Sequence, residues 1–507
     1  MSVLSRLILA TLFISFFSCK TVEKESNGKD GFILKQTVSF DHGVASGDPT
    51  SNAIILWTRI TTDGSAEGKW EISKDQKFNS IEQNGHFFTD NNADYTVKID
   101  VKNLDINTAY YYRFKSYGVI SPVGKTKTLD NSGVGEVSLG IVSCSNFQFG
   151  YFSAYRHLAQ KNIDIVLHLG DYFYEHGPEG YGDAEFERKH DPPHELLTLQ
   201  DYRTRYAQYR SDEDLKLIHQ NHPFIAIWDD HEISNDAYKD GAQNHQKEEG
   251  DYMQRTAFAK KAYYEWMPIR SNEKNVLYRD FNLGPLADII VLDERLIGKT
   301  KPVEKPEEVG AEQSMLGPEQ LLWFKKKMSD SDATWKIIGN QVIFSHLKLG
   351  KVRPTAPLNL DAWDGYAVER DDIIDHIDQN NIENVVFVTG DTHTSWAFEI
   401  PKSISNYQET GSAVGIEFGT PSITSSNWND TGRSDELVKG AEQLIKSDNP
   451  HLKYVNGRDH GYMILKLTKE EARVDWYFVN NIKEKDSGEK WAKSMRVKKG
   501  TTKILED

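Results

Sequence analysis

Side chains that can bind metal ions follow four separate apolar segments of this chain. A single acidic residue after a strand is ordinary, because Asp and Asn begin turns and cap helices. Four such segments, each followed by donors at its carboxyl end, favour one shared metal site. In chain order, the segments and their donors are Ile141–Ser143 with Cys144, Leu167–Leu169 with Asp171 and Tyr174, Ile225–Trp228 with Asp229, Asp230 and His231, and Val386–Thr389 with Asp391 and His393.

The donor types indicate which chemistry such a site could perform. Bound cations lower the pKa of water and stabilise charge on phosphoryl oxygens, so the site suits hydrolysis of phosphate esters. A carboxylate at the end of a central strand, such as Asp171, can bridge two cations. Thiolate and phenolate suit an oxidised transition metal such as ferric iron, whereas oxygen-only sites suit Ca²⁺ or Mg²⁺. Cys144 and Tyr174 beside Asp171 therefore predict one iron-like and one alkaline-earth-like position.

The elements that must position these donors fall into two parts. From about Phe40 to Leu129, short strands alternate with Gly, Asn, Asp and Ser clusters, which predicts a β-sandwich. From about residue 135 onward, apolar strands alternate with amphipathic segments, the pattern of a layered α/β fold whose ligand sites gather at the carboxyl ends of strands. The expected strands of this part are Val137–Val142, Ile163–Leu169, Phe224–Ile227, Ala287–Leu292, Trp335–Ile338 and Val385–Thr389.

Composition and charge exclude several classes of protein. The chain has 507 residues, of which 38% are hydrophobic and 11% aromatic, enough for about two or three packed domains and too many for a wholly disordered chain. Its 60 Lys and Arg against 76 Asp and Glu give a net charge of −16, a poor match for duplex nucleic acid as an obligate partner. Past the N-terminus, no apolar run is long enough for a membrane helix.

The first 19 residues resemble a bacterial lipoprotein signal, in which the Cys is lipidated. Arg6 precedes the apolar stretch Leu7–Phe17, and Ser18 precedes Cys19. A plain signal peptide is the alternative, because two Phe residues replace the usual Leu-Ala/Ser pair. We expect an exported, lipid-anchored protein of the periplasm or cell surface, with residues 20–36 as a flexible tether. Cys144 is then either a small buried residue or a thiol protected by coordination.

Ordered motifs between about Phe40 and Phe478 are similar to those of the PhoD-type alkaline phosphatases, within the calcineurin-like metallophosphoesterases. Purple acid phosphatases are similar in layout but usually carry Asp in place of Cys144 and His in place of Asp391. The motifs are Gly43–Pro49, Leu56–Arg59, Val142–Ser145, His168–Tyr172, Trp228–Glu232, Tyr264–Arg270, Leu292–Arg295, Met315–Gln320, Gly339–Gln341 and Thr389–His393.

The resemblance implies an α/β (α+β) architecture. We expect a fibronectin-like β-sandwich at residues 37–130, a four-layer αββα metallophosphoesterase domain at 135–482, and a C-terminal tail at 483–507. The family also implies cofactors, namely Fe³⁺ and Ca²⁺, with Mg, Mn or Zn as substitutes. The residues implied at the iron-like position are Cys144, Asp171, Tyr174 and His393. Asp230 stands in the place of the superfamily's metal-binding Asn, and Asp391 is implied as a ligand for a calcium-type ion.

Several other residues keep two interpretations. Asn235 either binds metal or caps a following helix, and His231 is either the general acid or a residue that orients a metal ligand. Arg295 either clamps the substrate phosphate or belongs to an ion-pair network with Asp293. Two further residues, Asn340 and His346, are equal candidates for an additional ligand, and the hydroxyl-rich segment Gly419–Ser426 is expected near the site without an assigned role.

The resemblance implies an exported alkaline phosphatase and phosphodiesterase. It would hydrolyse phosphomonoesters and phosphodiesters by in-line attack of a metal-bound hydroxide, as a monomer that scavenges phosphate from small-molecule or lipid esters. Nucleic acids are conceivable substrates rather than required partners. The alternatives are a phospholipase D-like phosphodiesterase, a metallo-hydrolase of another ester, and a non-enzymatic glycan-binding lipoprotein rich in Trp and Tyr. A binding module would not need the donors at the strand ends.

Overall fold

The computed structural model describes residues 22–23, 35–132, 135–272, 276–348 and 359–506. The predicted signal peptide and most of the predicted tether lie outside the described residues. Two short strands, β1 (Val22–Glu23) and β2 (Lys35–Gln36), pair antiparallel. In the described part of the chain, no helix combines the length and apolarity that crossing a membrane requires.

The N-terminal part is a β-sandwich, as the sequence predicts. Alternate residues of its two sheets meet in a shared core that contains Leu56, Ile72, Val97, Tyr112 and Phe114. A short pair, β3 (Val38–Ser39) with β6 (Thr61–Thr62), lies beside it. One sheet is formed by β11 (Val119–Ile120), β10 (Ala109–Ser116), β7 (Ala66–Ser73) and β8 (Gln83–Thr89), with β12 (Gly124–Lys127) paired to β10; the opposing strands are β4 (Val44–Gly47), β5 (Ile54–Arg59) and β9 (Thr96–Val101).

The opposing strands of the sandwich continue into the largest sheet of the molecule. Its ten strands run in the order β26-β25-β24-β23-β13-β14-β15-β4-β5-β9. The junction is the parallel pairing of Gly47 with Phe224, where a Cβ on Gly47 would lie 2.2 Å from the carbonyl oxygen of Pro268. The remaining strands are β13 (Val137–Val142), β14 (Ile165–His168), β15 (Phe224–Ala226), β23 (Gly461–Leu467), β24 (Glu471–Val479), β25 (Glu489–Lys498) and β26 (Ile504–Glu506).

The C-terminal tail predicted for residues 483–507 is corrected by the structure. β25 pairs with β24 along its length, and β26 pairs with β25, so this segment forms the edge of the ten-stranded sheet. Met495 and Val497 are buried in the main core. Arg496 and Lys498 alternate with these two apolar residues, a short strand pattern that the prediction of a tail overlooked.

A second sheet of seven strands faces the first. Ile337 of β18 joins the core shared with the ten-stranded sheet, whereas its neighbour Ile338 faces the helices on the outer side. This alternation is what a strand buried on both faces requires. The order is β16 (Arg279–Leu283), β17 (Ala287–Val291), β18 (Trp335–Asn340), β19 (Val385–Thr389), β21 (Ala413–Gly419), β20 (Ser395–Pro401) and β22 (Leu452–Asn456).

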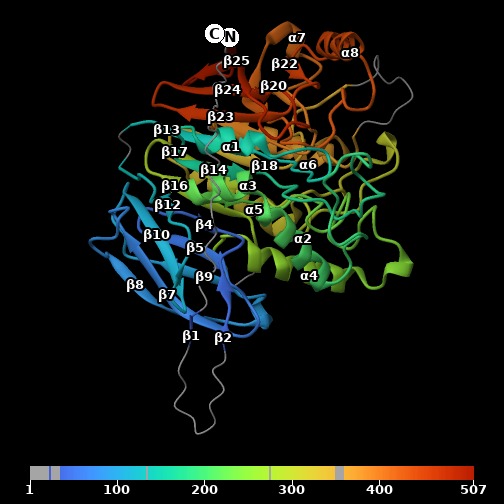
Figure 1. Ribbon diagram of the computed structural model, residues 1–507. Helices are drawn as coiled ribbons and strands as arrows, with labels where there is room; N and C mark the ends of the chain where they lie inside the picture. Colours follow the sequence, from blue (N-terminus) through green and yellow to red (C-terminus); the bar gives the residue numbers. More distant parts are fainter. Residues whose placement is uncertain (1–21, 24–34, 133–134, 273–275, 349–358, 507) are drawn as a thin grey trace, which may run out of the picture.

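Helices cover the outer faces of the two sheets, which gives the four layers that the sequence predicts (Figure 1). On the ten-stranded side lie α1 (Ser153–Ala159) and α3 (Glu213–Asn221), and on the seven-stranded side lie α5 (Gly317–Asp330) and α6 (Ala367–Gln379). The other helices are α2 (Leu199–Ser211), α4 (Tyr252–Trp266), α7 (Tyr407–Thr410) and α8 (Asp435–Asp448).

Candidate metal centre

The predicted donors lie directly after the ends of β13, β14, β15 and β19, where the chain turns sharply. Four of them adopt the left-handed region of backbone conformation, which costs a non-glycine residue roughly 1–2 kcal/mol. Such strain gathers at functional sites because the surrounding structure must hold it in place. The four are Cys144 (φ 61°), Asp171 (φ 53°), Asp391 (φ 60°) and His393 (φ 58°).

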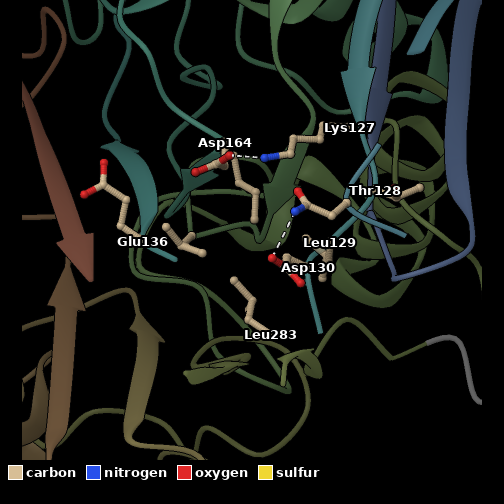
Figure 2. Close-up of a pocket in the computed structure, with 10 residues that line it drawn as sticks. Lys127, Thr128, Leu129, Asp130, Glu136, Asp164 and Leu283 are labelled. Carbon is tan, nitrogen blue, oxygen red and sulfur yellow. Dashed lines mark hydrogen bonds and ion pairs between the residues drawn. The ribbon is translucent and has the colours of Figure 1, made fainter. Parts of the chain in front are cut away.

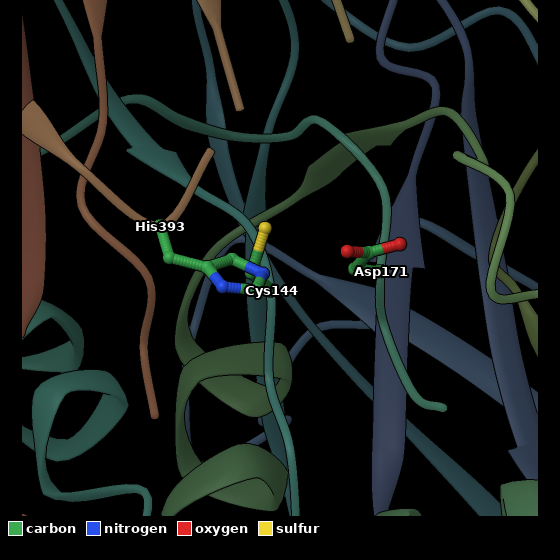
Figure 3. A group of neighbouring side chains, drawn as sticks. All are labelled: Cys144, Asp171 and His393. Atoms are coloured by element: carbon green, nitrogen blue, oxygen red, sulfur yellow. The ribbon is translucent and has the colours of Figure 1, made fainter. Parts of the chain in front are cut away.

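The four residues predicted for the iron-like position meet in one place. Ligand atoms of Cys144, Asp171 and His393 lie within 4.8 Å of one another, and Figure 3 shows these side chains side by side. The hydroxyl of Tyr174 donates to Oδ2 of Asp171 at 2.9 Å and lies 3.1 Å from Nε2 of His393. Cys144 and Tyr174 are fully buried. The donor set thus contains a thiol, a phenol, an imidazole and a carboxylate.

Two further groups of donors continue from this position. Asp171 also lies with Asp230 and His231, and Asp230 also lies with Asp229 and Asp391, each group within 4.8 Å. Asp171 and Asp230 therefore each belong to two groups, so shared carboxylates connect three adjacent positions. The sequence placed Asp229 among the donors at this strand end, but the family resemblance assigned only its neighbour Asp230 to a metal position.

Burial and like charge both disfavour ionised carboxylates in this cluster. Burial, followed by neighbouring carboxylates, raises the pKa of Asp391 well above its usual range, and burial raises the pKa of Asp171 in the same way despite the charge of His231. Burial also raises the pKa of Asp229 to about 6 and that of the Cys144 thiol well above 9.0. A bound cation would reverse each of these shifts.

The surroundings of two carboxylate oxygens show whether the residues fit a metal ion. Oδ1 of Asp171 and Oδ2 of Asp229 are buried and have no hydrogen-bond partner among the described residues. A buried carboxylate oxygen without a donor is costly, and coordination of a cation satisfies it. The orphaned oxygens lie in two different donor groups, so the residues fit more than one cation.

Arg295 lies within the acidic cluster rather than at its surface. Its Nε lies 2.5 Å from Oδ1 of Asp229, and its Nη1 is paired with Asp361. Asp391 and Asp230 lie 3.3 and 3.4 Å from Nη2. The predicted alternative of an ion-pair network agrees with this geometry, although the partners are not Asp293. Direct contact of Arg295 with phosphate stays a prediction.

The partners of Arg295 could not be found from the sequence. Asp361 and the fully buried Lys299 pair with each other, and Asp361 also pairs with Arg295, 66 residues away along the chain. Their pairing leaves no periodic signal that sequence analysis could detect. Together the side chains of Arg295 and Lys299 offset part of the negative charge of the acidic cluster.

His231 is held by a buried carboxylate. Its Nδ1 donates to Oε2 of Glu175 at 2.7 Å, and its ring centroid lies 4.2 Å from that of Tyr174. Burial alone would lower the pKa of His231, but the charges of Asp230, Glu175 and Asp171 raise it well above 6.5. With Nδ1 engaged, Nε2 is the nitrogen left for a metal ion or a leaving group. The geometry is compatible with both predicted roles, a general acid and a residue that orients a metal ligand, and direct coordination through Nε2 is a role that the sequence analysis did not propose.

Three other candidates are held by contacts outside the donor groups. Nδ2 of Asn235 donates to Gln243 at 3.0 Å, and no helix begins in residues 236–246, so its interpretation as a helix cap is wrong and its metal role stays a prediction. Nδ2 of Asn340 donates to Thr389 at 3.0 Å within the core. His346 lies 3.1 Å from Asp364 and belongs to none of the donor groups in the described chain.

A polar pocket elsewhere in the molecule contains none of these donors (Figure 2). It lies at the junction between the sandwich and the two large sheets. Lys127 pairs with Asp164 at 2.7 Å, and Nδ2 of Asn107 donates to Asp130 at 3.0 Å. Glu136 pairs with Lys466 at 2.8 Å, so the charged groups of the pocket are engaged by protein partners, and we assign the chemistry to the strand ends.

Comparison with known proteins decides the family. The model described as PhoD-like phosphatase matches residues 139–476, and the model for the N-terminal domain of PhoD-like phosphatases matches residues 29–130. The chain belongs to the PhoD-like phosphatase family. It is 36% identical over 463 residues to alkaline phosphatase D of Bacillus subtilis (strain 168), covering 86% of this chain and 77% of that protein.

A solved structure described as that of PhoD has the same architecture. It superposes with a TM-score of 0.82 at 33% identity, and the match covers 92% of each chain. The family resemblance and the α/β fold class predicted from the sequence are therefore confirmed. As a PhoD-like phosphatase, the protein is a hydrolase of phosphate esters, and its candidate metal-binding groups lie at the strand ends.

Proposed function

We propose that this PhoD-like phosphatase is a metal-dependent hydrolase of both phosphomonoesters and phosphodiesters. The observation that carries the proposal is the row of three donor groups joined by Asp171 and Asp230, with orphaned buried oxygens on Asp171 and Asp229. Carboxylates packed this closely are stable only with compensating positive charge. Arg295 and Lys299 supply part of that charge, and cations would supply the rest.

The donor types support two kinds of cation. Cys144, Tyr174 and His393 around Asp171 suit ferric iron, whereas the oxygen-only group of Asp229, Asp230 and Asp391 suits Ca²⁺. Mg, Mn or Zn are the alternatives. When bound, such cations would activate water for attack on phosphorus and stabilise the phosphoryl oxygens.

His231 is proposed to give a proton to the leaving-group oxygen. Glu175 fixes the ring through Nδ1 and is itself held by the backbone nitrogen of Asn235 at 2.7 Å and by Nδ2 of Asn244 at 2.8 Å. The ring is therefore restrained with Nε2 free to carry the transferred proton. The carboxylates around His231 favour its protonated form, which is the form that a general acid requires.

Export is proposed from the lipoprotein-like signal of residues 1–19. A lipid on Cys19 would tether the enzyme to a membrane, with residues 20–36 as spacer. Phosphate released from small-molecule or lipid esters outside the inner membrane would then be available for uptake. If the natural substrate is a phospholipid, the same centre would act as a phosphodiesterase on its headgroup.

Hydrolysis assays on two aryl esters test the proposed activity. Purified wild-type protein is expected to hydrolyse 4-nitrophenyl phosphate and its bis-ester at alkaline pH, and Asp171→Asn is expected to lower kcat/KM by at least about 100-fold on both. Asp330→Asn, an exposed acid-to-amide control on α5, should leave both rates unchanged. Near-normal turnover by Asp171→Asn would remove this residue from the centre. For His231→Gln, an equal loss on alkyl and aryl esters would contradict acid catalysis.

A further inference from the structure

We propose that Asp430, His460 and Ser422 are positioning residues for the ligands of the iron-like position. They act through the loop of residues 420–430, which contains most of the hydroxyl-rich segment Gly419–Ser426 whose role the sequence left open. This inference rests on the proposed metal at Cys144 and His393. It is carried by a continuous chain of hydrogen bonds that begins at the half-buried side chain of Asp430 and ends at three of the four predicted ligands.

The loop contacts the ligands at three points. Oγ of Ser425 lies 2.6 Å from the hydroxyl of Tyr174 and 2.9 Å from the carbonyl oxygen of Cys144. The backbone nitrogens of Ser425 and Thr424 donate to the same carbonyl at 3.2 and 3.3 Å. Nδ1 of His393 donates to the carbonyl oxygen of Ser426 at 2.7 Å, which leaves Nε2 as the coordinating nitrogen.

The conformation of the loop is fixed from the other side. Oγ of Ser422 donates to the carbonyl oxygen of Ser425 at 2.6 Å and lies 2.8 Å from Nδ1 of His460. Nε2 of His460 lies 2.8 Å from Oδ2 of Asp430, which also accepts from the backbone nitrogen of Asn427 at 3.0 Å. His460 stands at the start of β23, so the chain of bonds ties the loop to the rigid ten-stranded sheet.

An Asp, a His and a Ser in hydrogen-bond contact could also form a hydrolytic triad. The geometry excludes that role here. Ser422 is fully buried, and its hydroxyl proton is given to the carbonyl of Ser425, so it can neither reach a substrate nor be deprotonated by His460. Ser422 therefore transmits the orientation of His460 to the loop and does not act as a nucleophile.

The consequence is that metal retention depends on residues that do not touch the metal. Partners that orient metal ligands typically change affinity about 10–100-fold when removed. Asp430→Asn weakens the hydrogen bond that holds His460. Ser422→Ala removes the hydrogen bonds that connect His460 to the carbonyl oxygen of Ser425. Both leave the four ligand side chains unchanged, and Asp430, whose side chain is 31% exposed, tolerates an amide of the same shape.

The test measures loss of bound metal rather than activity. Wild-type, Asp430→Asn, Ser422→Ala and the double variant are loaded with iron, mixed with a chelator, and assayed by elemental analysis over time. Asp435→Asn, an exposed acid at the start of α8, is the matched control. We expect metal loss at least about 10-fold faster in both single variants, no change in the control, and no further increase in the double variant, because the two residues act in one chain.

Each outcome separates this inference from the proposed function. A wild-type protein that retains no metal at Cys144 overturns both. A wild-type protein that retains metal, with Asp430→Asn and Ser422→Ala losing it at the wild-type rate, overturns the positioning role alone. Thermal melts of the metal-free proteins complete the test: the inference requires the two variants to melt like Asp435→Asn, and faster metal loss explained by a lower melting temperature would contradict it.

Discussion

Removing the charge of Arg295 should destabilise the metal-free protein and make its stability depend on calcium. Arg295→Met keeps the length of the side chain but leaves Asp229 without its nearest cation and Asp361 with Lys299 alone, in a fully buried position. Breaking a buried pair by removing one partner costs about 3–5 kcal/mol. Because Lys299 still pairs with Asp361, we expect a loss of about 3 kcal/mol in the free energy of unfolding.

Urea unfolding of chelator-treated protein, with and without Ca²⁺, measures this effect. A cation at 100 times its dissociation constant adds about 2.7 kcal/mol to a protein that binds it only when folded. In Arg295→Met the added cation also neutralises the uncompensated carboxylates, so calcium should stabilise the variant by at least about 1 kcal/mol more than it stabilises wild type.

The control is Arg203→Met, which removes a buried arginine that pairs with one carboxylate, Glu265, at 2.6 Å and lies between α2 and α4. Calcium should stabilise this variant and wild type equally. A loss below about 1 kcal/mol in metal-free Arg295→Met, or an equal calcium increment in all three proteins, would refute the reasoning, because the acidic cluster would then be neutral without Arg295.

Two further predictions concern acid stability and the turn that carries Asp171. Burial and the charges of Arg59 and Arg210 lower the pKa of His42 to about 3, so below pH 6.5 the unfolded chain binds a proton that the folded chain does not, and stability falls. In urea titrations, the free energy of unfolding of His42→Phe should rise by about 2 kcal/mol relative to that of wild type as the pH falls from 7 to 5. A difference between the two proteins that does not change with pH would contradict this. Gly170→Ala should lower the free energy of unfolding by at least about 2 kcal/mol more than Gly250→Ala does. Both glycines have φ near 100°, but only at Gly170 would a Cβ lie 2.4 Å from Asp229. Equal losses of stability in thermal melts would show that the backbone strain matters and the steric clash does not.

The strand ends were predictable because an apolar run followed by donors is a local signal. Cys144, Asp171, Asp391 and His393 each stand two to four residues after the end of their strand, so topology alone brings them together. Taken alone, Cys144 fits a buried apolar residue and a ligand equally, and only its neighbours Asp171 and Tyr174 in the sequence favoured a ligand. The three-dimensional grouping with Asp171 and His393 favours the second.

Contacts between distant segments were not predictable. Arg295 meets Asp361, and His460 meets Ser422, across stretches of chain that carry no common pattern. The continuation of the sandwich into the ten-stranded sheet depends on one close approach at Gly47, which the sequence analysis named only as part of the motif Gly43–Pro49. In each case the information lies in long-range packing, which neither residue types nor periodicity report.

The most direct test of a multi-metal centre is the metal content of three purified proteins. Elemental analysis should find iron and calcium together in the wild type, calcium without iron in Cys144→Ser, and iron with reduced calcium in Asp391→Asn. That pattern would assign each kind of ion to its own donor group. A wild-type protein that is free of metal yet hydrolyses 4-nitrophenyl phosphate at the full rate would contradict the account.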